Sequence, residues 1–162
     1  MSSWAEYAKG THTMLRIYLE NGGDFLKYDN GDLRMTDKED ATIFYLLEHC
    51  SPADMRISYD LRLSPESEHS LISITAPTKN TQVNLSERNN DSDVYLFIKY
   101  HLNEQAGIKA ISIFSENHTG GDEFKHYACD NYGGGRVVWW NLDTSDTGRT
   151  AKPNQIFNLV FT

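Results

Sequence analysis

One pattern of alternating hydrophobic and polar positions occurs three times along the chain, at residues 42–50, 93–101 and 155–162. In each copy, β-branched and aromatic residues alternate with other residues, which is the pattern of a β-strand with one buried face. When the copies are aligned without gaps, Phe44 coincides with Phe157. A recurrence of this kind indicates an internal repeat and therefore constrains any prediction of the fold.

Shorter alternating segments precede each copy. Before the first copy they are separated by Asn- and Gly-rich segments at residues 21–23 and 29–31, which supply the positive φ angles of tight turns. Three units of four short strands predict an all-β fold, and specifically a β-trefoil in which three units close one barrel. A β-sandwich is the alternative, because alternation alone does not separate the two folds. We expect a lead-in at 1–12 and a single domain at 13–162, with units at about 13–50, 54–101 and 108–162.

The core of this fold is expected to come from the inward positions of the longer strands. Each of these side chains should contribute roughly 1.5–3 kcal/mol when it is buried. Stacking the three units around an axis also removes the exposed edges of the sheet. The predicted core residues are Leu15, Ile17, Phe44, Leu46, Ile57, Tyr59, Tyr95, Phe97, Ile111, Ile113, Phe157 and Leu159.

The composition excludes several classes of partner. The 162 residues carry a formal net charge of −8 and no basic run, so a nucleic-acid partner is not expected. No apolar stretch is long enough to span a membrane, and the N-terminus lacks the pattern of a secretory signal. We therefore expect a cytoplasmic protein or one secreted by a non-classical route. The sequence leaves open whether Cys50 and Cys129 are oxidised.

Motifs for catalysis are absent from the sequence. It contains no glycine-rich phosphate loop, no Gly-x-Ser-x-Gly elbow and no His-Glu-x-x-His pair. His118 and His126 lie near Asp122 and Cys129, but their spacing matches no standard zinc pattern. We expect no enzymatic activity, no catalytic residue, no cofactor and no metal site.

The most unusual segment is 129–143, which contains three consecutive glycines and two consecutive tryptophans. Aligning it with 33–35 and 83–85 predicts that Val138, Trp140 and Leu142 point inward. Their neighbours Val137, Trp139 and Asn141 then face outward.

An exposed tryptophan beside an asparagine suits a sugar, because the indole stacks on the pyranose and the amide binds its hydroxyls. Asp130, Asn131 and Tyr132, in the expected turn before the strand, would complete the polar set. The predicted sugar-binding residues are Asp130, Asn131, Tyr132, Trp139 and Asn141. Packing of Trp139 against a loop or against the lead-in is the structural alternative.

The opening unit, with Leu15-Arg-Ile-Tyr-Leu, an Asn-Gly-Gly turn and Phe25-Leu-Lys-Tyr, resembles that of many β-trefoil proteins. The closing Trp140-Asn141 and the strand at 155–161 are similar to the ends of fungal and ricin-B-like trefoil lectins. This resemblance implies a non-enzymatic lectin with glycans or glycoproteins as partners. The Gln-x-Trp signature of the ricin type is absent from all three units, and only the third unit has the aromatic residue, so we predict one site, in the third unit. The sequence does not determine the sugar specificity or whether the protein is a homodimer.

Two other classes of function share this fold. A trefoil protease inhibitor would act through an exposed loop, at 64–67 or 144–153. A protein-interaction module similar to the fascin trefoils would bind no small ligand.

Overall fold

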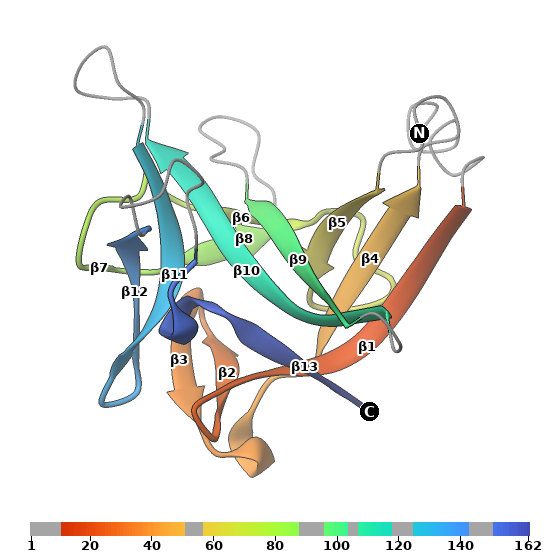
Figure 1. Cartoon of the computed structure of the whole chain (residues 1–162), viewed down its shortest axis with the longest axis horizontal. Coiled ribbons are helices and arrows are strands. Elements are labelled where there is room, and N and C mark those ends of the chain that lie inside the picture. The colour runs from red at the N-terminus through yellow and green to blue at the C-terminus, as the bar shows by residue number, and fades with distance from the viewer. Residues whose placement is uncertain (1–10, 51–56, 88–95, 104–106, 118–124, 143–150) are drawn as a thin grey trace.

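The computed structural model describes residues 11–50, 57–87, 96–103, 107–117, 125–142 and 151–162. Within these ranges the chain is all-β, as predicted, and its only helical elements are two 3₁₀ turns (Figure 1). The elements are β1 (Thr11–Asn21), β2 (Asp24–Asp29), β3 (Asp32–Thr36), η1 (Lys38–Asp40), β4 (Phe44–Cys50), β5 (Ile57–Arg62), β6 (Leu71–Ser73), β7 (Thr81–Gln82), β8 (Leu85–Glu87), β9 (Phe97–Asn103), β10 (Gly107–Asn117), β11 (Lys125–Gly133), β12 (Arg136–Asn141), η2 (Pro153–Gln155) and β13 (Phe157–Phe161).

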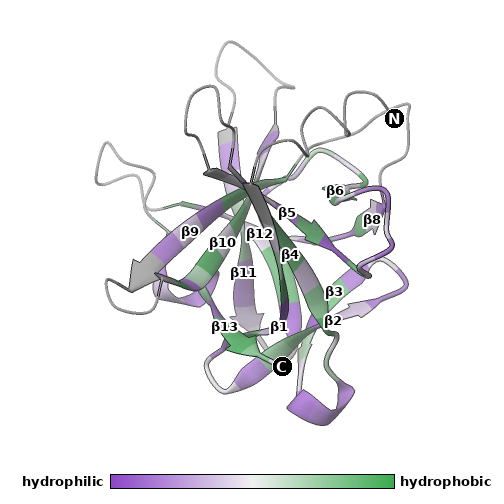
Figure 2. Cartoon of the chain, turned by 90° about the vertical axis from the view of Figure 1, so that its right-hand side faces the viewer, coloured by the Kyte–Doolittle hydropathy of each residue, from purple (hydrophilic) through white to green (hydrophobic). Residues whose placement is uncertain are grey.

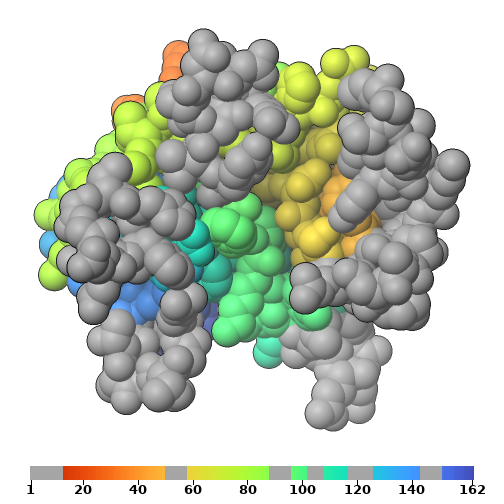
Figure 3. All heavy atoms as spheres, turned by 90° about the horizontal axis from the view of Figure 1, so that it is seen from above, coloured from red at the N-terminus to blue at the C-terminus, as the bar shows by residue number. Residues whose placement is uncertain are grey.

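Seven of the described strands close into an antiparallel barrel. The order is β1, β2, β3, β12, β11, β10 and β13, and β13 pairs with β1 to close the ring. Strands β4 and β5 extend the sheet from β1, and β9 pairs with β10. Strand β5 also lies against β9, and Figure 3 shows their residues side by side at the upper end of the molecule.

Three segments meet at the other end of the barrel: the β2–β3 hairpin, the segment 81–85 and the β11–β12 hairpin. Each segment pairs with each of the other two, so the contacts run in a cycle. Two backbone hydrogen bonds follow the same cycle, from the Leu33 N–H to the Val83 carbonyl and from the Val83 N–H to the Val137 carbonyl, each 3.1 Å long. The pairs are Arg136 with Arg34, Val138 with Gln82, Trp139 with Thr81, and Asp32 with Asn84.

Two glycines occupy matching places in this cycle. The Met35 N–H donates to the Gly135 carbonyl at 2.9 Å, and the Leu85 N–H donates to the Gly31 carbonyl at 2.7 Å. Gly31 and Gly135 have φ angles of 102° and 82°. A Cβ atom on either would come within 3.3 Å or 3.4 Å of a backbone carbonyl of the neighbouring segment. The positive φ angles therefore favour glycine at both places, and the added Cβ atom would also be crowded at Gly31.

The core fills the barrel, and hydrophobic and polar residues alternate along the strands around it (Figure 2). Most of the described members of the predicted core are confirmed. Leu15 and Leu159 are partly buried and pack against it. Tyr95 and the side chain of Ile57 lie outside the described residues. The confirmed buried residues are Ile17, Phe44, Leu46, Tyr59, Ile111, Ile113 and Phe157.

The prediction for Phe97 is wrong, because this side chain is 49% exposed. Leu96, Ile98 and Tyr100 of the same segment pack against the core instead. The ungapped alignment of the repeated pattern was therefore shifted by one residue in the second unit. Since side chains alternate between the two faces of a strand, a shift of one residue exchanges the faces.

Candidate functional site

The third hairpin, β11–β12, has the opposite orientation from the one predicted. Trp139 is only 2% exposed and belongs to the barrel core, together with the fully buried Val137. The hydrogen-bonding cycle shows why, because Val137, rather than Val138, matches Leu33 and Val83. The predicted alignment was again displaced by one residue, which exchanged the two faces of β12. Trp139 therefore has no free face on which a sugar could stack, and this part of the predicted site is wrong.

Residues Asp130, Asn131 and Tyr132 lie in β11 rather than in a turn. In β11, Asn131 is opposite Val137 and Gly133 is opposite Arg136, so the register shifts between Asn131 and Gly133. Tyr132 is the extra residue of this β-bulge. A bulge leaves one residue outside the regular pairing and redirects its side chain, and bulges are frequent beside functional sites.

The bulge places Tyr132 on the solvent-facing side of the hairpin, beside Trp140. The Tyr132 ring is 47% exposed, and its centroid lies 5.3 Å from that of Trp140, with an angle of 45° between the planes. Val138 precedes Trp140 on the same face of β12 and is fully buried. This face of β12 is therefore only partly open to solvent.

Two cations contact this aromatic pair. The Lys79 Nζ lies 4.8 Å from the centroid of the Trp140 ring, and the Arg136 Cζ lies 5.1 Å from the centroid of the Tyr132 ring. Lys79 comes from the loop before β7, which the Asn80 N–H joins to the Trp139 carbonyl at 2.8 Å. We call Tyr132, Trp140, Lys79 and Arg136 the aromatic platform.

A pocket of about 510 Å³ lies between residues of the first and third units, and we call it the amide pocket. Three of its side chains are asparagines, which offer both donors and acceptors. Asn21 is fixed because its Nδ2 donates to the carbonyls of Pro153 and Ile156, at 2.9 Å and 2.8 Å. The lining residues are Asn21, Gly22, Pro153, Asn154, Ile156 and Asn158.

Asp130 and Asn131 connect the amide pocket to β11. The Asn154 Nδ2 donates to Asp130 Oδ1 at 2.7 Å, and the Gln155 Nε2 donates to Asp130 Oδ2 at 3.0 Å. The Asn131 Nδ2 donates to Asn21 Oδ1 at 3.0 Å. The two predicted site residues thus support the wall of the pocket. Asp130 is only 2% exposed, so it positions Asn154 rather than facing a ligand.

Burial also raises the pKa of Asp130, although the hydrogen bond from Gln155 and the charge of Lys152 partly offset this effect. Asp130 and Tyr132 are two residues apart in β11, so their Cα atoms are separated by roughly 7 Å of strand. The amide pocket and the aromatic platform are therefore connected through consecutive residues of β11.

The structure brings together three of the five predicted site residues, Asp130, Asn131 and Tyr132. Asn141 is half-buried, and its carbonyl accepts a hydrogen bond from the Gln155 Nε2 at 3.0 Å. The residues that the sequence prediction missed are Trp140, Lys79, Arg136, Asn21, Asn154 and Asn158. A correct alignment of Val137 with Leu33 and Val83 would have placed Trp140 outward, whereas no local pattern links Lys79 to this hairpin.

A second surface feature is the loop 64–67, whose Pro65 and Glu66 are exposed. The buried Arg62 supports the loop from below, because its Nη1 donates to the Ser67 carbonyl at 2.7 Å. The Ser67 N–H in turn donates to the Ser64 carbonyl at 3.2 Å. The loop is thus fixed at its base while its tip remains accessible. The other loop considered for inhibition, 144–153, lies mainly outside the described residues.

Asp60 anchors Arg62 in this position. The Arg62 Nη2 donates to Asp60 Oδ2 at 3.2 Å, and the His49 Nε2 lies 3.1 Å from the same oxygen. Burial would raise the pKa of Asp60, but the hydrogen bonds and charges of His49 and Arg62 outweigh burial and lower this pKa. The network stabilises the β4–β5 pair and the loop that follows it.

Among the described residues, no group of three His, Cys, Asp or Glu side chains is arranged to hold a metal ion. Cys129 is fully buried in the core, and burial raises the pKa of its thiol. His118 and Asp122 lie outside the described residues. In the described part of the chain, no helix has the length and hydrophobicity needed to cross a membrane.

Comparison of the chain with protein-family models, with curated proteins and with solved structures finds no match.

Proposed function

We propose that the protein is a non-enzymatic carbohydrate-binding protein built on a β-trefoil, with one sugar site on the third hairpin. The cyclic contacts of the three segments support the trefoil, because each segment pairs with the other two in the same way. The order of the described strands supports it as well. Strands β1 to β4 form one four-strand unit, and β10 to β13 form another.

The observation that carries the proposed function is the exposed Tyr132 ring, inserted by a bulge and packed against Trp140. Sugars bind to proteins by placing their apolar C–H faces on aromatic rings, while amides and carboxylates bind their hydroxyls. The aromatic platform offers the rings, and the amide pocket offers Asn154 and Asn158.

The two cations do not obstruct this surface. Lys79 and Arg136 are exposed, and an exposed cation–π contact is worth only about 0.5–1 kcal/mol. Both side chains are long and can rotate away from the rings as a sugar approaches. Their position would then allow them to donate hydrogen bonds to the bound sugar.

A glycan array followed by calorimetry on the strongest hits tests the proposal. We expect binding by the wild-type protein, and a loss of roughly tenfold or more in the Tyr132→Ala and Trp140→Ala variants, because each removes a stacking surface. Phe161→Ala is the matched control, since Phe161 is an exposed aromatic residue, 58% accessible, on a different strand.

Absence of binding to every glycan would refute the proposed function. Binding that is equal in wild type, Tyr132→Ala and Trp140→Ala would remove the site while leaving a lectin elsewhere on the molecule. A protein-interaction module without a small ligand would give the first of these results.

The supported loop 64–67 favours inhibition of proteases as a second candidate function. An inhibitor must present a loop whose shape is already fixed, because ordering a loop on binding costs affinity. The hydrogen bond from the buried Arg62 to the Ser67 carbonyl provides this support. Incubation with serine and cysteine proteases tests it: inhibition by wild type that is lost in Glu66→Ala, but kept in Trp140→Ala, would favour this function over the lectin.

A further inference from the structure

The aromatic platform carries two positive charges on a protein whose formal net charge is −8. In the described part of the chain, neither Lys79 nor Arg136 forms an ion pair, and the recorded contact of each is with an aromatic ring. The distinctive feature is that both cations lie beside the same exposed aromatic pair, Tyr132 and Trp140.

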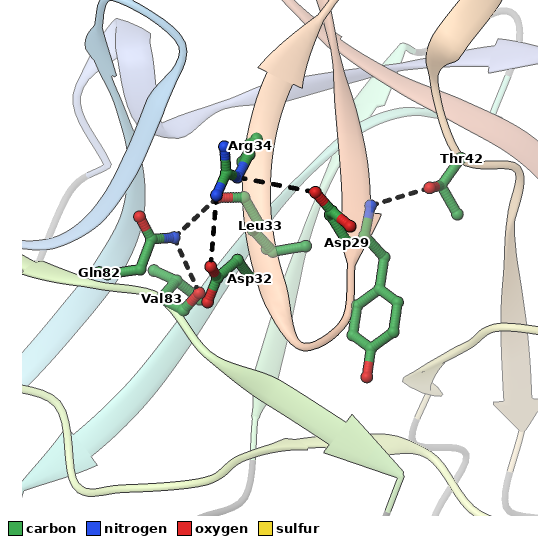
Figure 4. A network of polar contacts seen from close by, with 8 residues as sticks. Asp29, Asp32, Leu33, Arg34, Thr42, Gln82 and Val83 are labelled. Carbon is green, nitrogen blue, oxygen red and sulfur yellow. Dashed lines mark hydrogen bonds and ion pairs between the residues drawn. The ribbon is translucent and has the colours of Figure 1, made fainter.

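The neighbouring Arg34 shows what a paired cation looks like on this surface. Arg34 is the β-bridge partner of Arg136, and its guanidinium lies 4.0 Å from Asp29 Oδ2 and 3.6 Å from Asp32 Oδ2 (Figure 4). Its charge is therefore balanced within its own hairpin. Arg136 has the exposed Tyr132 ring in place of these carboxylates.

The fold does not require a cation at the position of Arg136. In the cycle of bridges, Asp32, Gln82 and Arg136 hold the same place in their three segments. Gln82 has a structural role, because its Nε2 donates to the carbonyls of Leu33 and Val83, at 2.8 Å and 3.0 Å (Figure 4). Asp32 neutralises Arg34. With the residues that the structure describes, Arg136 makes neither kind of contact, so its charge is available to a ligand on this part of the surface.

We infer that the aromatic platform binds a negatively charged sugar, in which a pyranose ring bearing a carboxylate or sulfate group stacks on Tyr132 and Trp140. The anionic group lies between Lys79 and Arg136. A guanidinium can hold a carboxylate or sulfate through two parallel hydrogen bonds, and an ammonium adds a further charge-assisted bond. This inference rests on the proposed function and names the class of sugar.

Calorimetric titration with three probes tests the inference: maltotriose as a neutral sugar, tri-galacturonic acid as a carboxylate, and a heparin tetrasaccharide as a sulfate. We expect at least one charged probe to bind more tightly than maltotriose. Lys79→Gln and Arg136→Gln should each weaken this binding roughly three- to tenfold, as expected for loss of one charge-assisted contact at a partly exposed site. Raising sodium chloride to about 0.5 M should also weaken it, because salt screens exposed charges.

The matched control is Lys38→Gln. Lys38 also lies over an aromatic ring, with its Nζ 5.5 Å from the Tyr18 centroid, but outside the aromatic platform. Lys38→Gln changes the net charge of the protein by the same amount as Lys79→Gln or Arg136→Gln. Because Lys38 lies outside the aromatic platform, this variant should leave the binding of the charged probe unchanged. An equal loss in Lys38→Gln would show that only the net charge matters, which would overturn the inference.

The remaining outcomes separate the inference from the proposed function. If maltotriose binds as tightly as the charged probes or more tightly, and Lys79→Gln and Arg136→Gln have no effect, the inference of a negatively charged sugar is overturned. The proposed carbohydrate-binding function is unaffected by that result. If inorganic sulfate alone binds as tightly as the heparin probe, the sugar ring of that probe is not recognised, and the inference is overturned while the lectin is still decided by the array. Failure of all three probes to bind, together with binding of a neutral glycan on the array, would also overturn the inference alone.

Discussion

The first hairpin, β2–β3, and the third hairpin, β11–β12, have nearly the same backbone pairing but carry different outward-facing side chains. Strands β2 and β3 pair in the same register as β11 and β12, so that inward residues of one match inward residues of the other. Only the bulge at Tyr132 interrupts the match. The corresponding cross-strand pairs are Leu26–Met35 and Cys129–Trp139, Lys27–Arg34 and Asp130–Val138, Tyr28–Leu33 and Asn131–Val137, and Asp29–Asp32 and Gly133–Arg136.

The polar groups of the first hairpin are occupied within the hairpin or by its neighbours. Arg34 pairs with Asp29 and Asp32, and the Thr42 hydroxyl accepts from the Tyr28 N–H at 2.8 Å (Figure 4). In the third hairpin, Gly133 and Arg136 stand where these two carboxylates stand in the first. The inward-facing positions of the two hairpins thus maintain the barrel core, whereas their outward-facing positions can carry different side chains. The third hairpin is the place where such a difference produces an exposed aromatic pair.

Trp139→Ala gives the largest expected effect and tests the inward half of the comparison. The substitution should lower the free energy of unfolding by about 3–5 kcal/mol, because it opens a large cavity in the core. Trp140→Ala, one residue along the same strand, should cost only about 1 kcal/mol through the loss of its contact with Tyr132. Urea denaturation measures both, and similar losses in the two variants would contradict the assigned faces of β12.

Asp130→Ala tests the support of the amide pocket. We expect a loss of about 1–3 kcal/mol in the free energy of unfolding, because the Asn154 and Gln155 amides lose the carboxylate that accepts from them. Lys27→Ala is the matched control, since Lys27 holds the corresponding place in the first hairpin. A loss no larger than that of the control would show that Asp130 does not hold the pocket wall.

The pH dependence of stability gives an independent measure of Asp130. Because its pKa is raised in the folded state, the folded protein binds this proton more tightly than the unfolded chain. The stabilising contribution is complete below the ordinary value of 3.8 and is lost as the pH rises through the folded pKa. Denaturation curves over this range should show that component in wild type and not in Asp130→Asn. Identical pH profiles for the two proteins would contradict the raised pKa.

Arg136→Asp gives the smallest expected change in stability. It gives the third hairpin the residue that the first has at the matching position, Asp32. Since Arg136 is exposed and makes no ion pair with the described residues, the free energy of unfolding should change by less than about 1 kcal/mol. Binding of the charged sugar probe should nevertheless be abolished, as repulsion replaces attraction. A large fall in the unfolding midpoint would show that Arg136 is structural.

The sequence predicted the all-β class and most of the described barrel core, because alternation records which strand faces are buried. Ile17, Phe44, Ile111 and Phe157 are all fully buried, as predicted. It failed where an alignment had to be exact to one residue. Phe97 and Trp139 were both assigned to the wrong face for this reason.

The site was less accessible to prediction than the core. Tyr132, Asp130 and Asn131 could be predicted because they belong to a segment with three consecutive glycines and two consecutive tryptophans. The bulge at Tyr132 could not be predicted, since an extra residue in a strand leaves no signature in the alternation. Lys79 and Asn21 reach the third hairpin from other units, and only the barrel brings them there.

The two adjacent indoles allow the most direct test of the central claim, that the third hairpin presents Trp140 to a ligand and keeps Trp139 in the core. The measurement is an NMR titration of the ¹⁵N-labelled protein with maltotriose, tri-galacturonic acid and the heparin tetrasaccharide, with the three indole N–H signals assigned from Trp140→Phe and Trp4→Phe spectra. The account predicts that a bound sugar shifts the Trp140 signal, while the Trp139 signal stays in place. A shift of Trp139 that exceeds that of Trp140, or an unmoved Trp140 signal with every probe, would contradict it.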